Sequence, residues 1–123
     1  MRSRVQELAQ LAYECVKEVK GKDFASKYLS YARKLPSMII YNGLLTTVAF
    51  AKTKKEDAWR KLLEHLEKFL RKEGIKQDNN DLIKFLSERE VQEYRFITKR
   101  VLDFSLWLKR IAEGEIEDDG KGD

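Results

Sequence analysis

The sequence has little of the chemistry that supports disulfides or membrane segments. It contains one cysteine and one proline among 123 residues. Cys15 alone cannot form an internal disulfide, and no apolar stretch reaches the length of a signal peptide or a membrane span. We therefore expect a soluble protein of the reducing cytoplasm, without membrane contact. A chain of this length can bury a core without disulfides or a structural metal, so one domain is predicted.

Catalytic groups are equally sparse. The only histidine, His65, and Cys15 belong to different predicted helices, so a nucleophile–base pair is not indicated. There is no glycine-rich phosphate loop and no zinc-ligand spacing. We interpret Cys15 as a core residue and His65, beside Leu62 and Leu66, as a surface or boundary residue. The sequence predicts a non-enzymatic protein without metal, cofactor or small-molecule substrate; an enzyme using His65 or Cys15 is the least supported alternative.

Charge is abundant and unevenly distributed. Hydrophobic residues make up 42% of the chain and charged residues 37%, interspersed as in amphipathic helices. The stretch Glu113–Asp123 holds six of the 21 acidic residues but one of the 25 basic ones, which leaves 24 basic and 15 acidic residues, a net charge of +9, in the remainder. Such a charge favours polyanionic partners; the alternative is that it only solubilises helix surfaces. We predict a folded domain over residues 1–113 and a flexible acidic tail over 114–123.

Apolar spacing predicts two helices at the start of the chain. Apolar residues three and four positions apart from Val5 to Val19 indicate the inner stripe of a helix that ends near Gly21. Asp23 is placed to cap a second helix, over residues 24–35. Pro36 is expected to break that helix or to begin a new first turn.

The segment Met38–Ala51 is ambiguous. Its continuous apolar run and the Asn42-Gly43 pair fit a buried strand or hairpin as well as a helix. No other segment offers a strand partner, and an isolated hairpin is only marginally stable. This absence favours the helix.

Two further helices are delimited by capping signals. Thr53 and Glu56 have the spacing of a capping box, which predicts the start of a helix that buries its apolar stripe and stops at Gly74. Ser87 and Glu90 have the same spacing. They predict the start of the longest helix, which continues to Gly114.

Between these two helices, residues 77–80 read as a polar loop and residues 81–86 as a short helix. No internal repeat or linker is apparent. The predicted fold is therefore all-α, a compact single-domain bundle of about six helices, packed orthogonally or in parallel.

Basic side chains are the best functional candidates, because binding a polyanion needs several lysines or arginines on one surface and no exact geometry. Trp107, beside Arg100 and Arg110, is a candidate for stacking on an unpaired base, although a core or subunit contact is the commoner role for such a residue. The candidate nucleic-acid-binding residues are Arg33, Lys34, Lys52, Lys54, Lys55, Arg95, Lys99, Lys109 and Arg110.

Two blocks of the sequence resemble one protein family. The first consists of Tyr28, Ala32, Arg33, Lys34, Leu35, Pro36, Ile39, Asn42, Gly43, Leu44, Thr47, Ala49 and Phe50. The second consists of Tyr94, Arg95, Thr98, Leu102, Trp107, Leu108, Lys109, Arg110, Ala112 and Glu113. In order and separation they resemble the small helical subunit of the Cmr (type III-B) CRISPR RNA-guided interference complex. The sequence departs from that pattern at Ile40, where the family often has a basic residue, and at Arg100, where it often has an acid.

The resemblance implies an all-helical fold in which Asn42-Gly43 lies within a helix and Gly43 allows close packing. It implies a non-catalytic subunit whose copies stack along an RNA-guided complex that defends against foreign nucleic acid. Its expected partners are other Cmr subunits, further copies of itself, and guide and target RNA, with cleavage left to other subunits. The alternative is a protein-interaction module that docks through surface around Trp107 and Tyr41 and does not contact nucleic acid.

Overall fold

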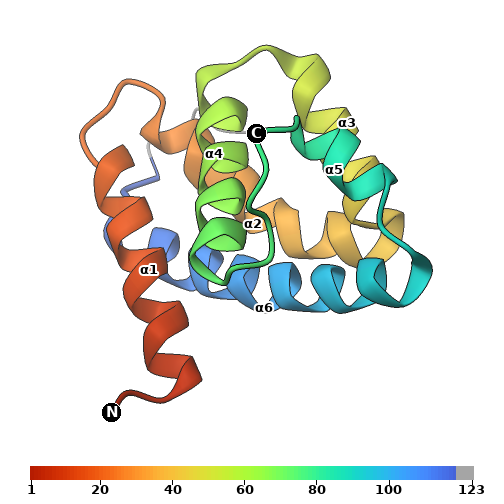
Figure 1. Ribbon diagram of the computed structural model, residues 1–123. Coiled ribbons are helices and arrows are strands. Elements are labelled where there is room, and N and C mark those ends of the chain that lie inside the picture. The colour runs from red at the N-terminus through yellow and green to blue at the C-terminus, as the bar shows by residue number, and fades with distance from the viewer. Residues whose placement is uncertain (119–123) are drawn as a thin grey trace.

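The longest helix, α6 (Val91–Glu115), runs along one side of the molecule and packs against α1 (Arg4–Val19) and α2 (Ala25–Asn42) in the computed structural model (Figure 1). The remaining helices are α3 (Leu44–Lys54), α4 (Asp57–Lys72) and α5 (Leu82–Ser87). The structure describes residues 1–118, which contain these six helices and no strand. The prediction of an all-α single-domain bundle of about six helices is confirmed.

The core forms where the apolar stripes of the helices meet. Phe104 from the inner face of α6 stacks on Phe69 from α4, with ring centroids 4.6 Å apart and planes inclined by 6°. Cys15 is also buried in this core, so its predicted role as a core residue is confirmed. Burial of a large aromatic side chain contributes roughly 1.5–3 kcal/mol to folding, so this pair ties α4 firmly to α6.

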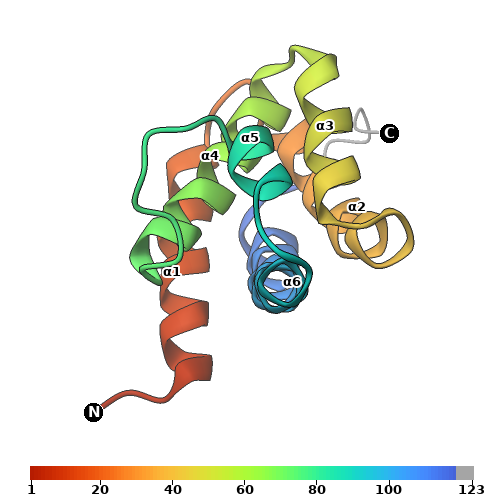
Figure 2. The ribbon, with the colours of Figure 1, turned by 45° about the vertical axis from the view of Figure 1, so that its right-hand side comes forward.

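The start of α1 differs from the sequence prediction. Ser3 and Gln6 form a capping box in which each side chain accepts a hydrogen bond from the other residue's backbone N–H. Val5, predicted on the inner stripe, is 56% exposed, and the buried stripe begins at Leu8. Apolar spacing alone placed Val5 inward, but no neighbouring helix covers the first turn of α1 (Figure 2).

The break after the second helix occurs at Gly43, not at Pro36. Helix α2 continues through Pro36, and the segment Met38–Ala51 is helical on both sides of Gly43. Gly43 has φ 86° and ψ 157°, a combination that is essentially restricted to glycine. The expectation that Asn42-Gly43 lies within a helix is therefore wrong, and a Cβ at Gly43 would meet only the Tyr94 hydroxyl, at 3.6 Å. Backbone conformation, rather than close packing, requires glycine here.

Neither predicted capping box forms. Thr53 lies inside α3, where its hydroxyl donates to the Phe50 carbonyl, and α4 starts later, at Asp57. At the start of α6, the Glu90 side chain itself accepts from the backbone N–H of Glu93. Ser87 is the last residue of α5.

The second helix also lacks its predicted cap. Phe24 occupies the N-cap position of α2, and no side chain accepts a hydrogen bond there, so Asp23 does not cap the helix. Spacing of polar residues is a weaker signal than the turn geometry that places each helix start.

The predicted acidic tail, residues 114–123, is only partly within the described chain. Gly114 and Glu115 complete the last turn of α6, and the side chain of Ile116 is buried. Residues 119–123 lie outside the described part of the chain. The flexibility of the tail stays a prediction.

Candidate nucleic-acid interface

Four basic side chains follow α6 on the side that faces solvent. Arg95, Lys99 and Arg110 are exposed, and Lys109 is half-buried at the edge of this side. Residues four and eleven positions apart lie on the same face of an α-helix, which aligns Lys99 with both Arg95 and Arg110. None of the four forms an ion pair with any carboxylate of residues 1–118. We call these four residues the basic face of α6.

Two other candidate residues are engaged by carboxylates. Arg33 donates from Nε to Glu113, at 3.2 Å, and from Nη1 to Asp118, at 3.0 Å. Lys52 pairs with Asp81, and the hydrogen bond from Lys52 lowers the pKa of the Asp81 carboxyl. A phosphate would have to compete with these carboxylates, so both residues are weaker candidates than the basic face of α6.

Lys34 and Lys54 lie at the two ends of an aromatic cluster. The Lys34 Nζ lies 5.9 Å from the centre of the Tyr31 ring, and the Lys54 Nζ lies 4.8 Å from that of Phe50. Trp59 stacks on Tyr31 with centroids 4.5 Å apart and meets Phe50 edge to face. Lys34 from α2 and Lys54 from α3 therefore contact two rings that both pack against Trp59.

The nine candidates do not form one surface. Lys52, Lys54 and Lys55 lie at the C-terminal end of α3, which Figures 1 and 2 both show on the opposite side of the bundle from α6. Arg33 joins the C-terminal end of α6 through Glu113. The structure thus separates a group at the end of α3 from a group along α6.

Sequence reasoning missed Phe96. Its side chain is 53% exposed, and the Arg100 guanidinium lies 5.3 Å from the centre of its ring. Trp107, the stacking candidate predicted from the sequence, is half-buried, and the Arg110 guanidinium lies 5.1 Å from the centre of its ring. One sequence signal could have identified Phe96: an aromatic residue followed three or four positions later by an arginine on a predicted helix.

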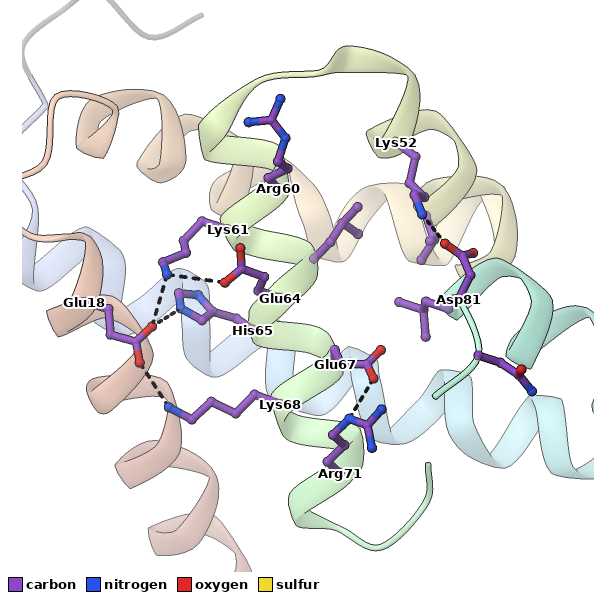
Figure 3. A pocket seen from close by; sticks show the side chains of 14 residues that line it. Glu18, Lys52, Arg60, Lys61, Glu64, His65, Glu67, Lys68, Arg71 and Asp81 are labelled. Carbon is purple, nitrogen blue, oxygen red and sulfur yellow. Dashed lines mark hydrogen bonds and ion pairs between the residues drawn. The ribbon is translucent and has the colours of Figure 1, made fainter. Parts of the chain in front are cut away.

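Basic residues also line an open groove of about 800 Å³ along α4 (Figure 3). Val48, Leu63 and Leu82 supply its apolar lining. Its charged residues carry both signs and most of them pair with one another, as Arg71 does with Glu67 and Lys68 with Glu18. Of these charged residues only Lys52 is among the nine candidates predicted from the sequence. The full set is Glu18, Lys52, Arg60, Lys61, Glu64, Glu67, Lys68, Arg71 and Asp81.

His65, on the wall of this groove, is not a surface or boundary residue. It is only 1% exposed, and both ring nitrogens have partners. The Tyr28 hydroxyl lies 2.6 Å from Nδ1, and Nε2 lies 2.9 Å from a Glu18 carboxylate oxygen (Figure 3 shows the Glu18 contact). Burial lowers the pKa of His65, with the hydrogen bond to Glu18 opposing it, so the ring is held neutral.

Other reactive groups are inaccessible or isolated. Burial raises the pKa of the Cys15 thiol to about 12, which suppresses the reactive thiolate. Residues 1–118 contain no group of three or more histidine, cysteine or acidic side chains placed to hold a metal ion. Within the same range, no helix combines the length and apolar character needed to cross a membrane.

Comparison with known proteins identifies the family to which this chain belongs. Residues 4–115 match the family described as CRISPR-associated protein (Cas_Cmr5). The CRISPR system Cmr subunit Cmr5 of Thermus thermophilus is 33% identical over 118 residues, covering 96% of this chain and 100% of that protein. The corresponding subunit of Thermotoga maritima is 34% identical over 110 residues, covering 87% of this chain and 80% of that protein.

A solved structure agrees with these sequence matches. The X-ray structure of a CRISPR-associated Cmr5 family protein from Thermus thermophilus superposes with a TM-score of 0.82, at 32% identity, covering 95% of this chain and 100% of that chain. The predicted resemblance to the small helical Cmr subunit is confirmed, and with it the prediction of a non-catalytic component. The chain belongs to the Cmr5 family of CRISPR-associated proteins.

Proposed function

We propose that this protein contacts the phosphate backbone of guide or target RNA through the basic face of α6, without reading sequence. It does so as a cytoplasmic subunit whose copies stack along a type III-B complex beside other Cmr subunits, in defence against foreign nucleic acid. The observation that carries the RNA contact is that Arg95, Lys99, Lys109 and Arg110 have no carboxylate partner among residues 1–118.

The physical basis is counterion release. Unpaired lysines and arginines displace the small cations that are condensed on the RNA phosphates, whereas an ion-paired residue must first give up its carboxylate. The span from Arg95 to Arg110 is 15 residues of helix, about 22 Å, which is long enough to follow several phosphates. Because phosphates are the same at every nucleotide, such a contact is independent of sequence.

Charge reversal tests the contact directly. The double variant Arg95→Glu/Lys99→Glu is compared with Lys22→Glu/Lys72→Glu, which changes the net charge equally at exposed residues of other segments. The dissociation constant for an unstructured RNA is measured at two salt concentrations. We expect about a tenfold or greater weakening and a smaller salt dependence for the α6 variant only. Equal effects of both variants would show that net charge, and not the basic face of α6, governs binding.

The exposed apolar end of α2 favours a second candidate, the protein-interaction module without nucleic-acid contact. Tyr41 is 84% exposed and Ile40 is 60% exposed, which is unusual for large apolar residues on adjacent positions. Under this candidate, Tyr41→Ser reduces recovery of other Cmr subunits in a pull-down, recovery is insensitive to salt, and RNA binding is negligible.

A further inference from the structure

Phe96 is an exposed aromatic ring that the rest of the fold holds in place. Arg100 lies against the ring, and its guanidinium pairs with Glu73, which follows α4. Glu73 also accepts from Arg4, at 2.9 Å, so one carboxylate fixes two guanidiniums. A side chain supported in this way loses less conformational entropy when a ligand binds to its open side.

Trp107 repeats the arrangement eleven residues along the same helix. The Arg110 guanidinium lies against its ring as Arg100 lies against Phe96. Eleven residues are three turns of α-helix, so the two rings lie on the same side of α6, about 16 Å apart along the axis.

Cations lie beside both rings. Arg95 and Lys99 flank Phe96 in sequence, and neither pairs with a carboxylate of residues 1–118. Asp103 is the acidic residue between the two rings. An exposed ring with unpaired cations beside it matches a single strand, whose bases present flat faces and whose phosphates repeat along the backbone. A duplex keeps its bases stacked inside and offers no such face to a side chain.

From this geometry we infer that α6 binds single-stranded RNA with unpaired bases stacked on Phe96 and Trp107, while Arg95, Lys99 and Arg110 bind the flanking phosphates. The inference rests on the proposed function, and it adds that the RNA bound by α6 is single-stranded. Stacking is independent of base identity, because every base has a flat aromatic face, so it agrees with binding that does not read sequence.

The first test removes the ring from Phe96. The dissociation constant of the full-length protein for an unstructured fluorescein-labelled RNA is measured for Phe96→Ala, Phe96→Trp and Phe50→Ala. Phe50 is the matched control, since it is an exposed phenylalanine, at 42%, on α3. Stacking on one base predicts a weakening of about 5- to 100-fold for Phe96→Ala, with native affinity restored in Phe96→Trp and little change in Phe50→Ala. The salt dependence should not change, because no charge is removed.

The second test observes the other ring. Base stacking on Trp107 should quench its fluorescence as RNA is added, and the quenching should disappear in Trp107→Phe, since Trp59 is buried. Native RNA affinity in Phe96→Ala together with unchanged Trp107 fluorescence would overturn the inference. If Arg95→Glu/Lys99→Glu still weakened RNA binding in that case, the proposed phosphate contact would stand without base stacking. If Phe96→Ala reduced recovery of Cmr subunits but left RNA affinity unchanged, the ring would be a protein contact and the inference would be wrong.

Discussion

The Tyr28 hydroxyl and His65 Nδ1 lie 2.6 Å apart in the interior of the bundle. His65 Nε2 contacts Glu18, so the chain of hydrogen bonds joins α2, α4 and α1. A carboxylate only accepts hydrogen bonds, which assigns the ring proton to Nε2 and leaves Nδ1 to accept from the Tyr28 hydroxyl. The neutral histidine is thereby satisfied at both nitrogens, and this explains how a polar ring is accommodated in the core.

Replacing Tyr28 with phenylalanine should destabilise the fold. The change leaves His65 Nδ1 buried without a donor, which costs about 1–3 kcal/mol. Urea unfolding followed by circular dichroism measures the loss, and Tyr13→Phe is the control because Tyr13 is exposed on α1. Equal stabilities of the two variants would show that the Tyr28 hydroxyl contributes nothing to folding.

Acidification should weaken the fold through His65. Its pKa in the folded protein is below the unfolded value of 6.5, because burial, together with the charges of Lys61 and Lys68, lowers it against the opposing contact with Glu18. The unfolded chain therefore takes up the proton first. The contribution of His65 to stability is present above pH 6.5 and is lost as the pH falls from 6.5 through the pKa of the folded state.

Burial raises the pKa of Glu18, but its hydrogen bonds and charge interactions with His65 and Lys68 together lower it below its ordinary value of 4.5. Its effect on stability therefore begins only below pH 4.5. The free energy of unfolding is therefore measured at pH 7.5 and 5.0 for the native protein and for His65→Gln. We expect a smaller difference between the two pH values in the variant. An unchanged difference would assign the pH dependence to other groups.

Two glycine substitutions should change the stability of the protein in opposite directions. Gly43→Ala forces a Cβ onto a backbone with φ 86°, and we expect a loss of about 1–3 kcal/mol. Gly114 lies within α6 with open space around it, so Gly114→Ala should stabilise the protein by roughly 0.5–1 kcal/mol. Thermal unfolding compares the two; a neutral Gly43→Ala would contradict the role of Gly43 as the α2–α3 joint.

Lys76 holds the loop after α4 against the bundle. Its side chain is fully buried, its ammonium pairs with Glu67 at 3.0 Å and Asp78 at 3.2 Å, and it donates to the Asp78 carbonyl. Lys76→Met should destabilise by about 1–3 kcal/mol through loss of these charged hydrogen bonds, with the partly exposed carboxylates limiting the effect. Lys72→Met, at an exposed position of α4, should change stability little. A stabilising Lys76→Met would indicate that the pairs do not offset the desolvation of the ammonium.

Sequence patterns sufficed for the helices whose position is set by an apolar stripe. The stripes of α4 and α6 were predicted because each helix buries one face continuously. Pro36 was misjudged, since packing of α2 against α4 and α6 outweighs the local preference for a break. His65 was misplaced although it lies three residues after Leu62 and four before Phe69, the spacing of the buried stripe.

The charge pattern was the least predictable feature. Arg33 pairs with Glu113, 80 positions away in sequence, and Lys52 with Asp81, 29 positions away. Only the tertiary arrangement brings such partners together, so no local pattern separates a paired cation from an unpaired one. By this criterion the fold distinguishes the basic face of α6 from Arg33 and Lys52.

Crosslinking in the assembled complex is the most direct test of an RNA contact at the basic face of α6. The tagged protein is purified from its source cells, bound RNA is crosslinked with ultraviolet light, and crosslinked peptides are identified by mass spectrometry. We expect recovery with other Cmr subunits and short RNAs, with crosslinks in the segment of α6 that spans residues 95–110. Recovery of the complex and its RNA with no crosslink to α6, or with crosslinks only at the end of α3, would contradict this contact.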